Sequence, residues 1–294
     1  ELTRNAEVAM NRAKDKGRDG YQFYTEGMNE QAATRVSLEA AMRRGLENDE
    51  FQVYYQPKYG LAEGRIVGME ALVRWRHPER GMVSPVQFIP LAEESGLIVE
   101  LGEWILRESC RQLRQWQAEG HDLTVAVNLS ARQFKQPNLM IVLEDILKGA
   151  GLAPSKLELE VTESAMMADV DKAIATLQHM RDLGLGVAMD DFGTGYSSLS
   201  YLKRFPISKL KIDQSFVREM HNNPADVAIV DAVLTLSRSL GIKVVAEGVE
   251  DARHVEMLRA RGCDEYQGYY FSRPLSADQF SLFLQAHREA MAAA

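Results

Sequence analysis

The sequence predicts an α/β fold, a TIM-like (β/α)8 barrel in which one strand is antiparallel to the others. From residue 50 onward, short apolar and β-branched segments alternate with amphipathic helical segments about eight times, which is typical of a parallel α/β barrel. The first two strand segments are joined by a loop with no room for a crossover helix, so they are expected to pair as an antiparallel hairpin. The chain has 294 residues, 46% of them hydrophobic, which is enough apolar material for one core of this size.

The first 48 residues are expected to lie outside the barrel. Residues Thr3–Lys16 predict a helix that ends at Gly17, and Tyr21–Tyr24 predict a short strand. Asn29–Glu47 predicts a second helix, which could link to the barrel or cover it. A helix and one strand cannot bury a core alone, so the first segment is expected to dock on the later part of the chain or to be the end of a neighbouring domain.

The barrel segments come in chain order after these residues. The predicted strands are Phe51–Gln56, Ile66–Trp75, Thr124–Asn128, Lys156–Val161, Gly186–Asp190, Lys209–Ile212, Lys243–Glu247 and Glu265–Gln267. The predicted helices are Pro85–Ser95, Gly102–Glu119, Asn138–Ala150, Ala168–Leu183, Ser197–Phe205, Pro224–Leu240, Asp251–Arg261 and Ser276–Ala290. Gly60 and Gly64 lie in the short loop of the expected hairpin.

Composition and charge exclude several classes of function. The chain carries 34 basic and 42 acidic residues, a formal charge of −8, and a surface of that sign repels nucleic acid. Cys110 and Cys263 stand far apart without partners at metal-binding spacing, so neither a disulfide framework nor a zinc site is expected. No apolar stretch approaches the roughly 20 residues of a membrane span, and no signal peptide opens the chain. We therefore expect a cytoplasmic domain without nucleic-acid or membrane contacts. Because the chain begins at Glu1, it is expected to be a fragment whose parent could carry a membrane anchor.

Polar side chains close almost every predicted barrel strand. They are Glu70, Asn128, Glu160, Asp190, Asp191, Lys211, Asp213, Glu247 and Gln267. In a parallel barrel the catalytic groups project from the carboxyl ends of the strands, so barrel closure is expected to bring these side chains to one rim. Any one of these acids alone would more often be a solvated strand end or a helix cap, but their coincidence at so many strand ends indicates a site.

Several of these side chains are carboxylates, and like charges this close cannot all ionise without a counter-charge. An all-oxygen ligand set with one Asn favours two Mg²⁺ or Mn²⁺ ions, and Ca²⁺ is expected to act poorly because it is larger and its coordination is looser. A pair of such ions about 4 Å apart is suited to in-line hydrolysis of a phosphate ester. Lys211 would then orient the attacking water or help to deprotonate it.

The motifs around these residues resemble those of a known family. They are Glu70-Ala71-Leu72-Val73-Arg74-Trp75, Asn128-Leu129-Ser130, Glu160-Val161-Thr162-Glu163, Asp190 to Ser198, Lys211-Ile212-Asp213, Ala246 to Glu250 and Gln267-Gly268-Tyr269. In this order, over most of the chain, they resemble the EAL domain, the family of cyclic di-GMP phosphodiesterases. Residues 1–24 resemble the C-terminal tail of a GGDEF domain, which suggests a parent chain with GGDEF and sensor domains upstream.

The resemblance implies a role for each motif residue. Glu70, Asn128, Glu160 and Asp190 would hold one metal, and Asp190 would bridge to a second metal held by Asp191 and Glu247. Lys211, Glu247, Asp191 and Asp213 would be the catalytic residues. Gln56, Leu72, Arg74, Gln267 and Pro274 would contact the phosphate or guanine of the substrate. Glu163 would anchor the Asp191–Ser198 loop instead of binding metal, and alternation along the strand agrees, because it sets Glu163 on the opposite face from Glu160.

The expected domain order is a GGDEF-like remnant (residues 1–28), a linker helix (29–48) and an EAL barrel (49–290). The expected activity is metal-dependent hydrolysis of cyclic di-GMP to linear pGpG in bacterial signalling. Two alternatives stay open: a module that binds cyclic di-GMP without cleaving it, and a barrel enzyme of unrelated chemistry such as an enolising Mg²⁺ lyase. A homodimer is also expected, because the helix Pro224–Leu240 has more apolar positions than one core-facing stripe needs.

Overall fold

The computed structural model describes residues 3, 6, 10, 21, 23–25, 27–193 and 199–293. The chain divides into two compact units, one of Glu1–Phe51 with Trp75–Leu97 and the other of Gln52–Arg74 with Ile98–Ala294. Of the predicted first helix, Thr3–Lys16, only residues 3, 6 and 10 are described, and these are helical. The rest of that prediction lies outside the described residues.

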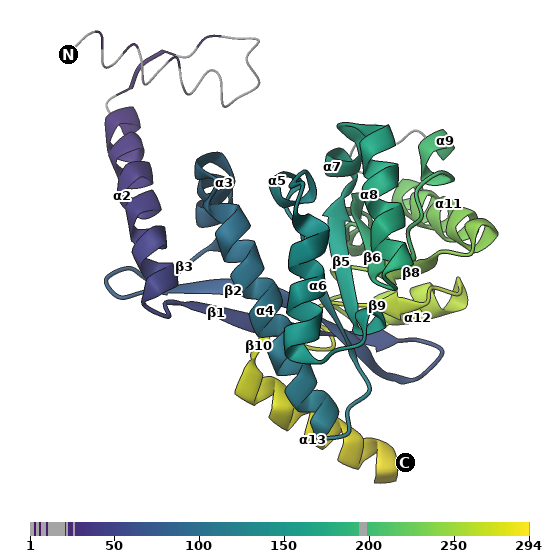
Figure 1. Ribbon diagram of the computed structural model, residues 1–294. Coiled ribbons are helices and arrows are strands. Elements are labelled where there is room, and N and C mark those ends of the chain that lie inside the picture. The colour runs from purple at the N-terminus through teal and green to yellow at the C-terminus, as the bar shows by residue number, and fades with distance from the viewer. Residues whose placement is uncertain are drawn as a thin grey trace. The chain divides into compact units, whose positions relative to one another are not determined.

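A closed barrel of eight strands forms the centre of the second unit (Figure 1). Its strands are β1 (Phe51–Gly60), β2 (Arg65–His77), β4 (Thr124–Asn128), β5 (Leu157–Thr162), β6 (Gly186–Phe192), β7 (Lys209–Ile212), β8 (Lys243–Ala246) and β9 (Glu265–Tyr266). Neighbouring strands pair in the order β2, β4, β5, β6, β7, β8, β9, and β1 closes the ring by pairing with both β9 and β2.

β1 is the reversed strand of this ring. It runs antiparallel to β9, with Tyr59 opposite Tyr266, whereas the six pairs from β2–β4 to β8–β9 are all parallel. A short further strand, β10 (Leu275–Ser276), pairs antiparallel with β1 outside the ring. The predicted barrel with one antiparallel strand is therefore confirmed.

Helices surround the strands of the second unit, close to where the sequence predicts them (Figure 1). They are α4 (Leu97–Ala118), α6 (Leu139–Ala150), α8 (Val170–Asp182), α11 (Pro224–Leu240), α12 (Ala252–Ala260) and α13 (Ala277–Ala293). Helix α8 contacts β6, and α11 contacts β7 and β8. Trp116 of α4 donates a hydrogen bond of 2.8 Å to Ser281 of α13 and stands edge-on to Tyr55 of β1, which ties both helices to the reversed strand.

Short elements at the ends of the strands were not predicted. They are α5 (Ala131–Phe134), η1 (Pro154–Lys156), α7 (Glu163–Met167) and α10 (Gln214–Arg218). Polar caps begin three of them: Ser130 forms a capping box with Gln133, Thr162 caps α7 and Asp213 caps α10. Helix α9 (Leu199–Leu202) is shorter than the predicted Ser197–Phe205, because Pro206 disfavours helical backbone before it; residues 197 and 198 lie outside the described part of the chain.

The first unit contains α2 (Gly27–Glu47), β3 (Gly81–Val83) and α3 (Pro85–Ser95). β3 pairs antiparallel with the end of β2, where Trp75 lies opposite Val83. Trp75 also stacks on Phe51 at 5.3 Å between ring centroids, and its indole nitrogen donates to the Glu50 carboxylate at 3.0 Å. The predicted helix Asn29–Glu47 is confirmed as α2.

The predicted strand Tyr21–Tyr24 is wrong for its described residues, since Tyr21, Phe23 and Tyr24 all lie outside any strand. Tyr21 is 77% and Phe23 is 78% exposed. An apolar run of this length forms a strand only where another strand accepts its backbone hydrogen bonds.

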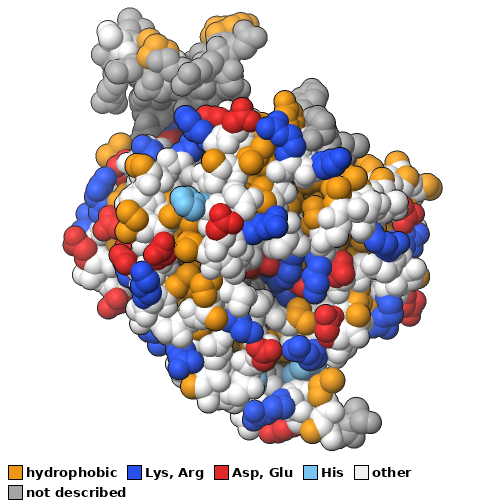
Figure 2. Space-filling view, turned by 45° about the vertical axis from the view of Figure 1, so that its right-hand side comes forward, with side chains coloured by type: hydrophobic (Ala, Val, Ile, Leu, Met, Phe, Trp, Pro, Cys, Tyr) orange, Lys and Arg blue, Asp and Glu red, His pale blue; other side chains and the backbone are white. Residues whose placement is uncertain are grey.

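The described helices and one face of the surface can be compared with the requirements of a membrane span and of a charged patch. Among the described residues, none of the helices combines the length and the apolar character that a membrane span requires. On the face that Figure 2 draws, acidic and basic side chains are interspersed among the coloured residues.

Candidate active site

A cavity of about 260 Å³ opens at the carboxyl ends of the barrel strands. Its walls include seven of the residues singled out from the sequence: Gln56, Glu70, Leu72, Asp190, Lys211, Glu247 and Gln267. These residues come from β1, β2, β6 and β7 and from the segments just after β8 and β9. Strand closure therefore brings side chains from distant parts of the sequence to one rim.

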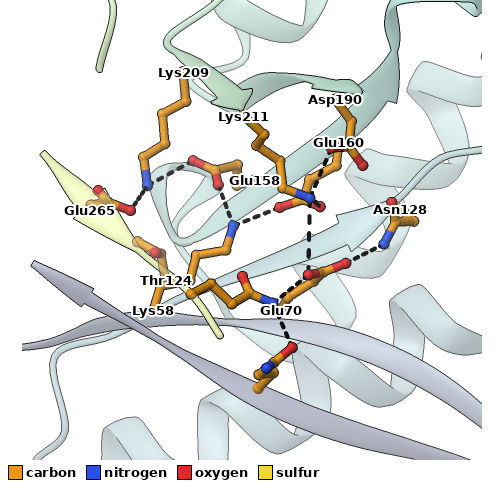
Figure 3. Close-up of polar contacts among 12 residues, drawn as sticks. Lys58, Glu70, Thr124, Asn128, Glu158, Glu160, Asp190, Lys209, Lys211 and Glu265 are labelled. Carbon is orange, nitrogen blue, oxygen red and sulfur yellow. Dashed lines mark hydrogen bonds and ion pairs between the residues drawn. The ribbon is translucent and has the colours of Figure 1, made fainter. Parts of the chain in front are cut away.

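Lys211 of β7 is the centre of the charges at this cavity. Its side chain is 1% exposed, and its Nζ lies 2.5 Å from Glu160 Oε2 and 3.1 Å from Asp190 Oδ1 (Figure 3). The same nitrogen lies 2.7 Å from Glu247 Oε1. Glu70 Oε2 lies 4.0 Å from the same nitrogen. Four predicted metal ligands from four different strands or strand ends thus surround one buried cation.

Amide side chains hold Glu70 on its other side. Asn128 Nδ2 donates to Glu70 Oε1 at 2.6 Å, and Gln267 Nε2 donates to Glu70 Oε2 at 2.7 Å and to Gln56 Oε1 at 2.9 Å. The remaining oxygen of Gln267, Oε1, is buried and has no hydrogen-bond partner among the described residues. A buried acceptor without a partner costs stability, so a ligand donor at this position would be stabilising.

Asp190 and Asp191 sit where β6 departs from regular pairing. The register between β6 and β7 shifts between Met189 and Phe192, and Asp191 has a φ of 56°, which is rare for a residue with a side chain. The Asp191 amide donates to Asp190 Oδ1 at 2.9 Å. A register shift at the end of a strand agrees with a functional site, because such irregularities commonly redirect side chains next to active sites.

Asp213, a predicted catalytic residue, lies just after β7. It caps α10 by accepting a 2.9 Å bond from the Ser215 amide. Asp213 is not among the residues that line the cavity, but its charge contributes to raising the pKa of Asp191, after the larger effect of burial.

A second layer of charges lies inside the barrel behind the cavity, and the sequence analysis missed it. Lys58 of β1 is 1% exposed, and its Nζ lies 2.6 Å from Glu160 Oε1 and 3.1 Å from Glu158 Oε1 (Figure 3). Lys209 Nζ in turn contacts Glu158 Oε2 at 3.1 Å and Glu265 Oε2 at 2.8 Å. The signal was present in β5, whose Leu-Glu-Leu-Glu alternation places Glu158 and Glu160 on the same, inward face.

Burial and these neighbours shift the pKa values of the acids in opposite directions. Burial alone would raise the pKa of Glu160, but Lys211 and Lys58 outweigh it and lower the pKa to about 2. Burial raises the pKa of Glu247 to about 8, against the attraction of Lys211 and with a contribution from Asp190. Burial also raises the pKa of Glu70. The site therefore has more acids than its lysines can keep ionised.

The donor set fits hard divalent cations. The two layers hold seven carboxylates (Glu70, Glu158, Glu160, Asp190, Asp191, Glu247 and Glu265) against three lysines (Lys58, Lys209 and Lys211), a formal excess of four negative charges. Two divalent ions would balance that excess. Oxygen ligands without sulfur or imidazole favour Mg²⁺ or Mn²⁺ over zinc.

Several further predicted residues are not part of the cavity wall, and these include the predicted metal ligands Asn128, Glu160 and Asp191. Arg74 donates from Nη1 to the Val73 carbonyl oxygen at 2.9 Å, and its guanidinium lies over the Tyr54 ring. Arg74 and Pro274 are not among the residues that line the cavity. Glu163 is buried at the first position of α7, not in the strand, and its Oε2 accepts a 3.5 Å bond from the Gly193 amide.

The cavity also has walls that were not singled out as site residues. They are Gln214, Arg218, Gly248, Glu250, Gly268 and Tyr269. Arg218 and Glu250 form an ion pair of 2.9 Å. Gly268 allows a close approach of two loops, since a Cβ there would lie 2.1 Å from the Val249 carbonyl oxygen. Glu250 and Tyr269 lie within the family motifs, but their spacing alone did not distinguish cavity walls from loop residues.

A group of two histidines and an aspartate lies next to the cavity, where His254 contacts the backbone of the wall residues Arg218 and Glu250. His221 Nε2 lies 3.0 Å from Asp251 Oδ2, and His254 Nδ1 lies 3.5 Å from Asp251 Oδ1. Asp251 and His254 are neighbours on one helical turn, but His221 lies 30 positions before Asp251, so the sequence did not reveal the group. The two rings are stacked, 4.0 Å apart and 20° from parallel, and their in-plane lone pairs cannot converge on one ion without a ring rotation. The metal candidates therefore remain the carboxylates of the cavity.

Comparisons with known proteins are consistent with this site. The model of the EAL domain family matches residues 39–274. The bifunctional diguanylate cyclase/cyclic di-GMP phosphodiesterase MucR of Pseudomonas aeruginosa is 47% identical over 280 residues, which cover 95% of this chain and 41% of MucR. The cyclic di-GMP phosphodiesterase NbdA of the same organism is 42% identical over 289 residues, covering 98% of this chain and 37% of NbdA. The chain thus spans about two fifths of the length of these relatives.

Solved structures show the same fold. A cyclic di-GMP complex of the PaMucR phosphodiesterase has a TM-score of 0.81 and 47% sequence identity, and the match covers 83% of this chain and 99% of that one. The FimX EAL domain from Pseudomonas aeruginosa bound to cyclic di-GMP has a TM-score of 0.75 at 25% identity, covering 82% of this chain and 98% of that one.

Proposed function

This chain belongs to the EAL domain family, and from that premise we propose that it hydrolyses cyclic di-GMP to linear pGpG with the help of two divalent metal ions, Mg²⁺ or Mn²⁺. The observation that carries the proposal is the cluster around Lys211, in which Glu70, Glu160, Asp190 and Glu247 converge within 4.0 Å of one buried ammonium group. Such a cluster repels an anionic phosphodiester until cations neutralise it.

The chain's own residues would divide the work of binding and chemistry. Glu70, Asn128, Glu160, Asp190, Asp191 and Glu247 would hold the metals, which when bound supply Lewis acidity and a water of lowered pKa. Gln267 Oε1, buried and without a partner among the described residues, is a ready acceptor for a guanine N–H. Gln56 and Leu72 line the same cavity and would orient the substrate beside it.

Lys211 would act as a hydrogen-bond donor. Burial by itself lowers the pKa of Lys211, but Glu160 and Glu247 outweigh it and raise the pKa well above its usual value. A protonated ammonium can orient an attacking water and attract developing negative charge, but it cannot take a proton from that water. The water oxygen would bond to phosphorus, the bond from phosphorus to the 3′ oxygen would break, and that oxygen would leave with a proton, giving pGpG.

The organisation of the parent protein is a further part of the proposal. We place a GGDEF-like remnant at residues 1–28, a linker helix at 29–48 and the catalytic barrel at 49–290. The name of MucR joins a diguanylate cyclase to a phosphodiesterase, and this chain covers only 41% of that relative. That name supports a diguanylate cyclase domain in the parent chain, and the proposal adds that this domain is of the GGDEF type and lies upstream together with sensor domains.

The test is incubation of the purified chain with cyclic di-GMP, followed by chromatography of the products. Conversion to pGpG should need Mg²⁺ or Mn²⁺, should stop in EDTA, and should be poor with Ca²⁺, whose coordination is larger and looser. Full activity in EDTA would contradict metal dependence. Tight binding of cyclic di-GMP without any product in Mg²⁺ or Mn²⁺ would instead support the alternative of a non-catalytic receptor.

A further inference from the structure

We propose that Lys58 is a positioning residue that makes Glu160 a one-oxygen metal ligand and thereby selects Mg²⁺ over Ca²⁺. The inference rests on the proposed metal site and adds to it the determinant of metal choice. It concerns a residue of the reversed strand β1 that contacts the metal ligand Glu160 from behind the cavity.

The two oxygens of Glu160 have separate partners. Oε1 accepts from Lys58 Nζ at 2.6 Å, and Oε2 accepts from Lys211 Nζ at 2.5 Å (Figure 3). Lys211 also contacts Glu247 and Asp190 of the cavity wall, so Oε2 is the oxygen on the cavity side of Glu160, although Glu160 itself is not among the residues that line the cavity. Both oxygens therefore accept from a lysine, and Oε1 is the one whose lysine, Lys58, does not line the cavity.

Lys58 cannot easily leave this position. It is 1% exposed, and a second carboxylate, Glu158, holds its Nζ from another side at 3.1 Å. Release of Glu160 Oε1 would leave a charged lysine in the barrel interior with one of its two partners lost, which is unfavourable in a medium that cannot solvate it. A metal that binds at the rim therefore meets Glu160 through Oε2 alone.

One-oxygen binding discriminates between the ions. Mg²⁺ demands near-ideal octahedral geometry and takes carboxylates through one oxygen readily, whereas Ca²⁺ takes six to eight oxygens and commonly binds a carboxylate through both. A carboxylate fixed from behind thus withholds one of the oxygens that Ca²⁺ would use. Partners behind a metal ligand commonly change metal affinity by about 10-fold to 100-fold when removed.

The barrel offers a matched control in Lys209. It is a partly buried lysine of the same network, with a side chain 12% exposed, and it bonds two carboxylates, Glu158 and Glu265. Lys209 contacts these two acids and not Glu160, so its removal perturbs the same interior without freeing Glu160 Oε1.

The experiment measures metal binding directly and does not depend on turnover. Mn²⁺ binding to the wild type, Lys58→Met and Lys209→Met is followed by the electron paramagnetic resonance signal of free Mn²⁺, and Mg²⁺ and Ca²⁺ are then titrated as competitors. In Lys58→Met the ratio of Ca²⁺ to Mg²⁺ affinity should rise by about 10-fold or more, while Lys209→Met should keep the wild-type ratio. If Lys58→Met does not fold, Lys58→Met with Glu158→Gln removes one charge of each sign, and Lys209→Met with Glu265→Gln is its control.

An unchanged ratio in the Lys58 variants, or an equal change in the Lys209 variants, would overturn the role of Lys58. Absence of Mn²⁺ binding to the wild type would overturn both the role and the proposed function. A third outcome is that the wild type binds Mn²⁺ and the Lys58 variants change the metal ratio as expected, but the wild type does not cleave cyclic di-GMP. That outcome would support the role of Lys58 and contradict only the proposed hydrolysis.

Discussion

At the scale of single residues, variants of Lys211 and Glu247 should affect turnover more than substrate binding. The 2.7 Å contact between them places a donor and a proton-binding carboxylate together on the cavity wall. We expect Lys211→Met and Glu247→Gln each to lower turnover of cyclic di-GMP by at least about 100-fold, the scale of lost acid–base or electrostatic assistance. Substrate binding, measured by calorimetry in Ca²⁺, should change much less, most clearly in Lys211→Met.

The control for these two variants is Glu144→Gln, on the exposed face of α6, where Glu144 pairs with Lys148. It should keep wild-type turnover. Wild-type turnover in both Lys211→Met and Glu247→Gln would remove these two residues from the mechanism.

Glu247 also predicts how metal binding depends on pH. Its pKa of about 8 in the metal-free protein means that a metal must displace a proton from it at neutral pH. Mn²⁺ affinity should therefore rise between about pH 6 and pH 8, by at most about 10-fold per unit for one proton, with proton release visible in weakly buffered solution. Glu247→Gln should release fewer protons; equal proton release by the variant and the wild type would contradict this assignment.

The raised pKa of Glu247 also predicts in which direction the stability of the metal-free protein changes with pH. Because the folded-state pKa of Glu247 lies above the unfolded value of 4.5, its contribution to stability is fully present below about pH 4.5 and is lost as the pH rises through about 8. Metal-free protein should lose thermal stability over that range, and the loss should be smaller in Glu247→Gln, as measured by the unfolding midpoint in EDTA. A larger loss in the variant would contradict the raised pKa.

At the scale of elements, the bulge in β6 depends on the helix that comes after β5. Glu163 begins α7, and its carboxylate accepts a hydrogen bond from the Gly193 amide, two residues after Asp191, whose φ is positive. Glu163→Ala should free this segment and lower turnover by about 10-fold or more, because small displacements of catalytic groups are costly. Glu163→Gln, whose amide oxygen can still accept the bond, should keep most of the activity.

Hydrogen exchange of the peptide after β6 is the second measurement for this prediction. Exchange should be faster in Glu163→Ala than in Glu163→Gln. A crystal structure with Glu163 bound directly to a metal would refute the anchoring role.

The elements also show what could be predicted from sequence. Several elements have the predicted bounds, because apolar periodicity and nearby proline or glycine residues define them locally. They include the strands Thr124–Asn128 and Lys209–Ile212 and the helices Pro85–Ser95 and Pro224–Leu240. The short helix α10 was missed, because one turn with a side-chain cap has no periodicity to detect. Tyr21–Tyr24 failed because local β propensity does not supply a partner strand.

At the scale of the whole molecule, barrel closure decides which charges meet. The rim acids could be predicted, because every parallel strand ends at the same rim. The contact of Lys58 with Glu160 could not be predicted, because the two residues are 102 positions apart and meet only through the reversed direction and register of β1. An interior that buries Lys58, Glu158 and Glu160 also restricts substitution, since removing one partner of a buried ion pair typically costs about 3–5 kcal/mol.

The surface of α11 gives the last prediction, which concerns assembly. Val230 and Val233 pack in the core of the second unit, as one face of a barrel helix should. Other apolar positions of the same helix lie outside that face: Ile229 is 36% exposed, and Ala228 and Ala232 beside it are also exposed. We expect this second face to pair two copies of the chain, because contiguous exposed apolar surface on a folded domain usually marks a contact.

Sedimentation at micromolar concentration should show a dimer for the wild type. Ile229→Asp would place two unpaired charges in a two-fold interface, so the dissociation constant should rise by at least about 100-fold. Ile141→Asp is the control, because Ile141 on α6 is 65% exposed and lies on a different helix; it should remain dimeric. A wild type that is monomeric and fully active would show that pairing through α11 is not needed for the chemistry, and the exposed apolar stripe would then require another partner.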